Sequence, residues 1–332
     1  MSHLSPSGRR LLSGLLVLLG IGLAEAVGAG SARAQVGSAL VAVPWQPGQR
    51  ASVNNYFFGL DSQSEGTTLD TDLRRAVSFG RLRFDVENET PLAVGWLYDH
   101  LDLDTADAAL PPRLVSAAGA VGFNLGDIVP DWRINASVGA GVSGSQPFAD
   151  EDAWYGLASL VASKRLDQTS ALTLVLDYDG SRAIFPDIPL PGFQYTYFGS
   201  PTLRYSLGLP FSTLFWKPDD RWTVDLQYAV PLGGRATVSY QLDERWAAYA
   251  GYSSTTRGYH LEGDDEHRRL FFSQERAELG LTLDAAAGWK WTFAGGWAFG
   301  QEFTRGFDVR DDELVRELDD APYLRLALDV SF

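Results

Sequence analysis

The last ten residues, Tyr323-Leu-Arg-Leu-Ala-Leu-Asp-Val-Ser-Phe332, alternate in character up to the terminus. One face carries the apolar residues Leu324, Leu326, Leu328, Val330 and Phe332, and the other carries Arg325, Ala327, Asp329 and Ser331. A period of two is typical of a β-strand, because successive side chains leave opposite faces. The stretch therefore predicts a strand, which fits both a soluble β-sandwich and a closed membrane barrel.

The N-terminus indicates export from the cytoplasm. Arg9 and Arg10 precede a short apolar core at 11–23, and Ala32-Arg-Ala34 places small residues before Gln35. A basic start, a short apolar core and an A-x-A site together predict a cleaved signal peptide at 1–34. The core has about 13 residues, whereas a membrane-spanning helix needs about 20.

Composition narrows the class of the mature chain. The sequence has no Cys, which excludes a disulfide framework and thiolate metal sites. Its formal net charge of -15 argues against nucleic acid as a partner. No later segment is typical of a membrane-spanning helix, but 12% aromatic residues and 34 Gly fit a barrel of short amphipathic strands.

Alternation of the kind seen at the C-terminus recurs along the mature chain. It is clearest at 131–142, 221–230 and 289–300, where one face is apolar and the other polar or small. About 14 strands are predicted, with 12 as the alternative count if one weak hairpin is misread. The predicted spans are 51–60, 74–87, 91–103, 113–125, 131–143, 154–166, 170–180, 198–208, 221–230, 234–242, 245–258, 270–283, 289–302 and 321–332. A phase slip near Gly80 predicts a β-bulge there.

The lengths of the connections favour a membrane barrel over a sandwich. Counted backward from the C-terminus, long segments such as 303–320, 259–269 and 181–197 alternate with short ones such as 284–288, 243–244 and 167–169. Outer-membrane barrels have long outer loops and short periplasmic turns. Segment 231–234 is shorter, and segment 209–220 longer, than this rule expects. The fold class predicted is all-β, a transmembrane antiparallel up-and-down β-barrel at 51–332, with 35–50 as a periplasmic tail, a lumenal segment or an extra strand.

In such a barrel the apolar face contacts lipid and the other face lines the lumen. The lumen-facing candidates are Arg133, Asp177, Asp179, Arg204, Asp225, Glu278, Lys290, Arg325 and Asp329. Small residues mixed with both signs of charge suit either a narrow aqueous channel or a packed polar interior. A barrel of 14 strands leaves a lumen of roughly 10–15 Å.

No catalytic, cofactor-binding or metal-ligating set is predicted. An embedded lipid hydrolase needs a Ser beside His100 or His260, and His260 lacks the Ser two residues later that outer-membrane phospholipases carry. Asp102 and Asp104 lack the glycine and distal glutamate of a calcium loop. We expect this loop and Asp311-Asp-Glu313 to be solvated.

The stretch Leu214-Phe-Trp-Lys-Pro218, Trp222, Tyr228, Pro231 and the Gly-Tyr-His-Leu segment 258–261 resemble an uncharacterised bacterial outer-membrane barrel family. The resemblance implies the fold and no activity. The C-terminus also looks like the closing strand of an outer-membrane barrel, where it carries the signal read by the assembly machinery. We therefore expect an outer-membrane protein with lipid, that machinery and small solutes as partners, acting as a channel or transporter. A structural or surface-interaction barrel with a filled lumen is the alternative.

Overall fold

A computed structural model describes residues 36–43, 45, 48–64, 69–85, 92–186, 188–229, 233–265 and 267–332. The predicted signal peptide at 1–34 lies outside these residues. No helix in the described part of the chain is long and apolar enough to cross a membrane.

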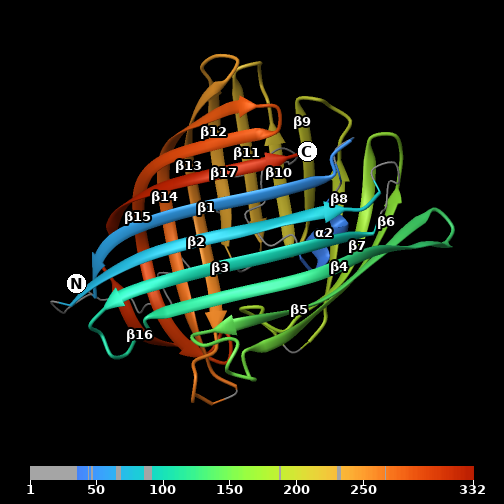
Figure 1. Ribbon diagram of the computed structural model, residues 1–332. Helices are drawn as coiled ribbons and strands as arrows, with labels where there is room; N and C mark the ends of the chain where they lie inside the picture. Colours follow the sequence, from blue (N-terminus) through green and yellow to red (C-terminus); the bar gives the residue numbers. More distant parts are fainter. Residues whose placement is uncertain are drawn as a thin grey trace, which may run out of the picture.

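Antiparallel strands form one closed wall (Figure 1). They are β1 (Ala51–Gln63), β2 (Asp70–Arg83), β3 (Ala93–Thr105), β4 (Arg113–Val129), β5 (Trp132–Gly144), β6 (Trp154–Arg165), β7 (Ser170–Asp179), β8 (Leu190–Tyr197), β9 (Leu203–Leu209), β10 (Phe211–Trp216), β11 (Trp222–Ala229), β12 (Gly233–Gln241), β13 (Trp246–Tyr259), β14 (Arg269–Ala286), β15 (Trp289–Gly306), β16 (Glu313–Leu318) and β17 (Ala321–Ser331). Strands β1 to β9 and β10 to β16 each pair with the next in sequence, and β9 and β10 lie side by side. β17 pairs with β15 on one side and with β1 on the other, which closes the wall. Because β16 and β17 pair with successive parts of β15, they act as one interrupted strand, and the wall has 16 positions.

The predicted all-β antiparallel barrel is confirmed, but the predicted count of 14 strands is wrong. The two missed strands are β8 and β10, which lie within the segments 181–197 and 209–220 that were taken for connections. Pro191, Gly192 and Pro210 made these segments read as loops, although Phe193, Tyr195 and Tyr197 share one face of β8. The predicted bulge at Gly80 is also wrong, since β2 pairs with β1 and β3 there without a shift. A side chain at Gly80 would instead collide with the ring of Trp96, 2.4 Å from the position of a Cβ atom.

The barrel is divided along its axis. We call the end that holds residue 51 and the C-terminus the near end, and the opposite one the far end. At the far end β13 contacts β5 directly: the N–H of Ser145 donates to the carbonyl of His260 at 2.9 Å, and the N–H of His260 donates to Ser143 at 2.9 Å. Gly144 and His260 form a parallel bridge. The far half is therefore closed by β1–β5 and β13–β17, which we call the ring. Strands β6–β12, which we call the lobe, widen mainly the near half, although β6 pairs with β5 as far as Val142.

The ring has a packed apolar interior. Its core includes Phe58, Leu73, Leu101, Phe272 and Phe303, which come from five strands and are 0–3% exposed. Counted with β16 and β17 as one position, the ring has about nine strands, and a barrel of eight is just wide enough for side chains to fill it. The far half is thus filled by ordered side chains.

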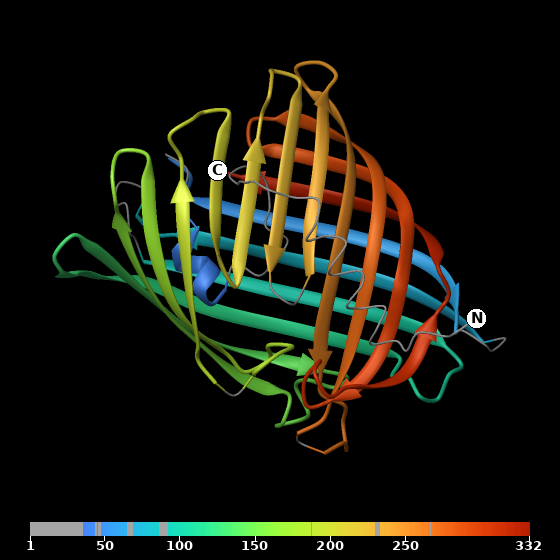
Figure 2. The same cartoon turned by 180° about the vertical axis from the view of Figure 1, so that it is seen from behind.

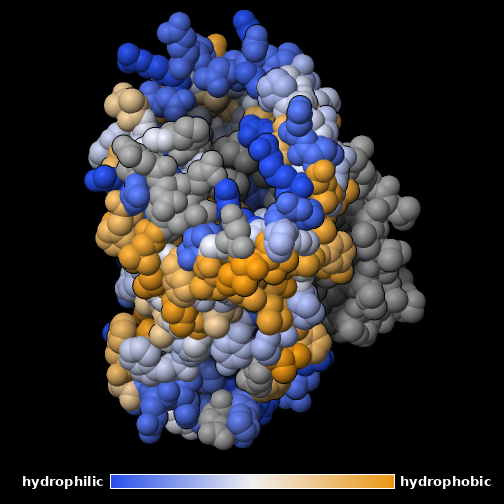
Figure 3. Space-filling model, turned by 90° about the vertical axis from the view of Figure 1, so that its right-hand side faces the viewer, coloured by the Kyte–Doolittle hydropathy of each residue, from blue (hydrophilic) through white to orange (hydrophobic). Residues whose placement is uncertain are grey.

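The outer surface carries an apolar band with polar residues on either side of it (Figure 3). Outward-facing apolar side chains on the strands include Val138, Leu160, Leu174, Leu176, Phe193, Leu207, Leu279 and Phe293, all more than 36% exposed. Exposed Trp216, Trp222 and Trp289 lie at the near ends of their strands, as interface aromatics do. A closed wall with an apolar band satisfies backbone groups where lipid cannot. The fold is that of a transmembrane β-barrel.

The segment after the predicted signal lies inside the near half of the barrel (Figure 2). The short helix α2 (Ser38–Ala42) buries Leu40 against Ala93 of β3 and Ala120 of β4. Arg81 holds the segment by donating to the carbonyl of Val43 at 2.6 Å and by lying 4.0 Å from the ring of Trp45. The described residues of 36–45 thus contact inward-facing side chains of the wall.

Candidate functional site

The inward face of the lobe is polar and partly exposed. It carries four predicted lumen residues: Asp177 and Asp179 on β7, Arg204 on β9 and Asp225 on β11. Strand pairing places them on the same side as Ser159 and Gln194, opposite to the lipid-facing Leu174 and Phe193. Other inward residues of the lobe, Thr173, Gln227, Arg235, Thr237 and Ser239, are partly exposed as well. Because these inward residues of the lobe are partly exposed, water has access to the lobe side of the near half. We call this space the chamber.

Asp177 links the chamber wall to α2. Its carboxylate accepts hydrogen bonds from Ser159 at 2.6 Å, from Arg182 at 2.8 Å and from the backbone N–H of Ser38 at 3.3 Å. Ser137 donates to the carbonyl of Gly37 at 2.8 Å. The segment in the lumen is therefore fixed by side chains from three strands, and it leaves the wall of β8–β12 uncovered by α2.

Three further predicted residues belong to the near end. Arg133 lies at the start of β5 and is exposed. Lys290 approaches Asp284 at 3.6 Å, and Asp329 pairs with Lys290 across β15 and β17. Asp329 shares the face of β17 that carries Arg325, so these charges border the lumen close to its near opening.

The predicted Glu278 and Arg325 meet at mid-height in a network that crosses three strands. Arg325 donates from Nη2 to Oε1 at 2.6 Å and from Nε to Oε2 at 3.0 Å. Tyr323 and Tyr249 also donate to the carboxylate, at 2.7 Å and 2.9 Å. A bidentate, fully hydrogen-bonded pair of this kind offsets the cost of burying both charges.

A second buried set, which was not predicted from the sequence, lies beside this network. Asp99 of β3 is 0% exposed and accepts two bonds from Arg75, at 2.8 Å and 2.6 Å, and an ion pair from Arg257 at 2.8 Å. Arg276 of β14 lies 5.0 Å from the ring of Phe58. These four residues occupy inward positions of strands whose sequence alternates between polar and apolar residues, and that pattern could have identified them. We call Arg75, Asp99, Arg257 and Arg276, together with Glu278 and Arg325, the charged layer.

The C-terminal strand places its predicted apolar face outward. Leu324 is 75% exposed and Phe332 is 64% exposed, while Arg325 on the other face turns inward. β17 pairs with β1 from Ser52–Ser331 to Leu60–Tyr323. The carbonyl of Phe332 also accepts the N–H groups of Arg50 and Ala51 at 2.6 Å and 2.8 Å. The last residue thus takes part in the seam of the barrel. Leu326 is exposed as well, and Leu328 and Val330 are partly exposed on the same strand face.

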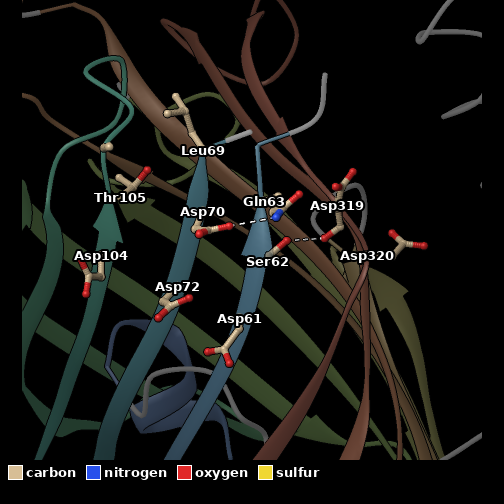
Figure 4. Close-up of a pocket in the computed structure, with 11 residues that line it drawn as sticks. Asp61, Ser62, Gln63, Leu69, Asp70, Asp72, Asp104, Thr105, Asp319 and Asp320 are labelled. Atoms are coloured by element: carbon tan, nitrogen blue, oxygen red, sulfur yellow. Dashed lines mark hydrogen bonds between the residues drawn. The ribbon is translucent and has the colours of Figure 1, made fainter. Parts of the chain in front are cut away.

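The far end carries an acidic depression of about 800 Å³ (Figure 4). Its lining includes Asp61, Asp70, Asp72, Asp104, Asp319 and Asp320. The carboxylates of Asp61, Asp72 and Asp104 come from three neighbouring strands. Within the described residues there is no group of three or more His, Cys, Asp or Glu arranged to hold a metal ion. The depression gives the far rim a strong negative charge.

The histidines do not form the serine pair that a hydrolase needs. His100 contacts Tyr98 at 3.0 Å and Asp102 at 2.7 Å, all on one face of β3. His260 contacts Ser143 and Ser145 through backbone atoms. No serine hydroxyl bonds to either imidazole within the part of the chain that the structure describes.

No family model matches the chain, and no curated protein matches it. The predicted membership of an uncharacterised family therefore stays a resemblance. Among solved structures, an outer membrane channel from Pseudomonas putida is similar over 92% of this chain and 100% of its own, with 11% identity and a TM-score of 0.36. The similarity to the Pseudomonas putida toluene transporter TodX covers 93% of this chain and 95% of that protein, with 10% identity and a TM-score of 0.39. The similarity to the translocator domain of the Neisseria meningitidis autotransporter NalP covers 89% of this chain and 92% of that domain, with 12% identity and a TM-score of 0.32.

Proposed function

We propose that this protein moves small solutes across the outer membrane through the chamber. The partial exposure of the inward polar side chains of the lobe carries the proposal. A barrel that served only as a scaffold would not need the further strands β8–β12, which end short of the far rim. In this arrangement the near end faces the periplasm, because both termini of an outer-membrane barrel lie there.

The route between the chamber and the outside passes beside the ring. The ring interior is packed, so a straight path along the axis is closed in this conformation. The lobe ends early: β9 turns into β10 at Pro210, and the described ladder between β12 and β13 ends at Arg235–Ser253. β13 continues beyond that ladder to Tyr259. The space past the far ends of β8–β12 is the exit that we assign.

Residues 181–186 extend from the lobe toward the ring. The carbonyl of Ala183 accepts the N–H of Val309 at 3.0 Å, and Arg269 donates to the carbonyl of Arg182 at 3.0 Å. Arg310 stacks on Phe185 at 3.9 Å. These contacts fix the far border of the proposed exit.

Conduction is tested with the refolded mature chain in planar bilayers and in solute-loaded liposomes. Thr237 faces the chamber and its neighbour Val238 faces lipid, so the pair provides a matched control. We expect Thr237→Trp to reduce conductance and solute flux and Val238→Trp to leave both unchanged. Equal effects of the two variants, or no flux through the unaltered barrel, would contradict the proposal.

The packed ring favours a second candidate, a structural or surface-interaction barrel. That candidate predicts no conductance and no uptake defect in a deletion strain. The acidic far rim would then be its contact surface. The same bilayer and uptake measurements separate the two functions.

We further propose that residues 1–34 direct export and that the outward face of β17 is read by the barrel-assembly machinery. The support is the sequence pattern of each segment and the position of Phe332 in the seam.

A further inference from the structure

The charged layer holds more positive than negative charge. Arg325 and Glu278 balance each other, and Arg75 and Arg257 share one carboxylate, that of Asp99. Arg276 lies within electrostatic range of the same carboxylate. Arg75, Asp99 and Arg276 are 4%, 0% and 8% exposed. An uncompensated charge in such a position is costly, because the interior does not replace the water that it loses.

Arg276 is the least satisfied of these groups. Its Nε and Nη1 atoms are buried and have no hydrogen-bond partner among the described residues. Its guanidinium lies 5.0 Å from the ring of Phe58 and 5.9 Å from that of Tyr323. The rings attract the cation through their faces but provide no acceptor for its N–H groups in the guanidinium plane.

Tyr259 adds an unused donor to the same layer. Its hydroxyl is buried without a hydrogen-bond partner in the described structure, and the residue is 0% exposed. Tyr259 and Arg276 both lie within electrostatic range of Arg75. Unsatisfied buried donors are rare in folded proteins, and several around a positive surplus indicate a missing acceptor.

We propose that the charged layer is an anion-binding site for a carboxylate or an inorganic oxyanion. The Nε–H and Nη1–H groups of Arg276 each offer one donor to such a group, and the hydroxyl of Tyr259 is a further donor. The side chain of Arg257 is 26% exposed, so water reaches the charged layer at this residue. That the anion is part of a transported solute rests on the proposed function, but the binding site itself does not.

The site is tested by calorimetric titration of the folded mature barrel in a neutral maltoside detergent at low salt. The probes are sodium acetate, sodium octanoate and inorganic phosphate, which separate a carboxylate-bearing solute from a free oxyanion. We expect saturable binding of at least one probe to the unaltered barrel. In Arg276→Met the affinity for that probe should be at least about tenfold weaker, because charge-assisted hydrogen bonds are removed. Arg204→Met is the control, because Arg204 is an inward arginine that also stacks on a ring, that of Phe215 at 4.9 Å.

Thermal stability gives a second readout that a purely structural arginine would not produce. Without anion, we expect the midpoint temperature of heat-modifiability to be as high in Arg276→Met as in the unaltered barrel, or higher. Addition of the probe should raise the midpoint temperature of the unaltered barrel and leave that of Arg276→Met unchanged. If Arg276→Met does not assemble, Tyr259→Phe replaces it, with binding weakened several-fold.

No saturable binding of any probe, or equal binding by Arg276→Met and the unaltered barrel, would overturn the site. Anion binding by a barrel that does not conduct would overturn the proposed function and leave the site intact.

Discussion

Phe303 tests whether the ring is packed as a solid core. It is 0% exposed and its ring stacks on that of Phe272, with centroids 4.6 Å apart and planes 22° apart. Replacing a buried Phe by Ala costs about 3–5 kcal/mol, the sum of lost transfer free energy and the cavity left behind. We expect Phe303→Ala to lower the free energy of unfolding by this amount, near the upper end because a stacked pair is lost as well.

The matched control is Phe293→Ala on the same strand. Phe293 faces lipid and is 47% exposed, so acyl chains fill the space that the ring leaves. Only the transfer component is lost, and we expect about 2 kcal/mol or less. The measurement is reversible denaturant unfolding from phospholipid vesicles, followed by tryptophan fluorescence.

The reasoning is refuted if Phe303→Ala costs no more than Phe293→Ala, since the far half would then be hydrated or loosely filled. The double variant Phe272→Ala with Phe303→Ala adds a functional readout. If the ring closes the axis, this variant should conduct more than the unaltered barrel in planar bilayers.

Three further predictions concern single positions. Gly300→Ala should lower the free energy of unfolding by about 1–2 kcal/mol, because Gly300 has φ 56° at the point where β15 gains a residue relative to β14. Gly295 has no positive φ, so Gly295→Ala should lower it by less in the same assay. Deleting Phe332 should reduce the amount of heat-modifiable barrel in the outer membrane, and unchanged levels would argue against its role in the seam. Burial alone would raise the pKa of Asp308, but hydrogen bonds from Arg310 and from the Phe185 N–H outweigh it and hold the pKa below 3.8. The carboxylate therefore stabilises the contact with residues 181–186 above about pH 4 and stops doing so as pH falls through its lowered pKa. The hydrogen-exchange protection factors of that segment, corrected for the intrinsic exchange rate, should fall below about pH 4, and Asp308→Asn should remove this dependence.

The fold was predictable from local patterns to the extent that those patterns are strong. Strands such as β5, β11 and β17 alternate cleanly, and their predicted spans differ from the observed ones by only a few residues. β8 and β10 were missed because Pro191, Gly192 and Pro210 are typical of turns, and a strand of 6–8 residues contains too few repeats to outweigh them. Adding β10 reduces segment 209–220 to a short near turn at 217–221, but it also creates a one-residue far connection at Pro210 that departs from the loop rule.

The sequence by itself determined the alternation, the absence of cysteine chemistry and the polar or apolar character of each strand face. These depend on neighbouring residues and on a period of two. Only the tertiary structure decided that β5 meets β13, because a contact between residues 144 and 260 has no local signature. That contact divides the barrel into a packed ring and a hydrated chamber. It also determines the charged layer: Arg75, Arg257 and Arg276 are ordinary inward residues on separate strands, and closure alone places them around one carboxylate.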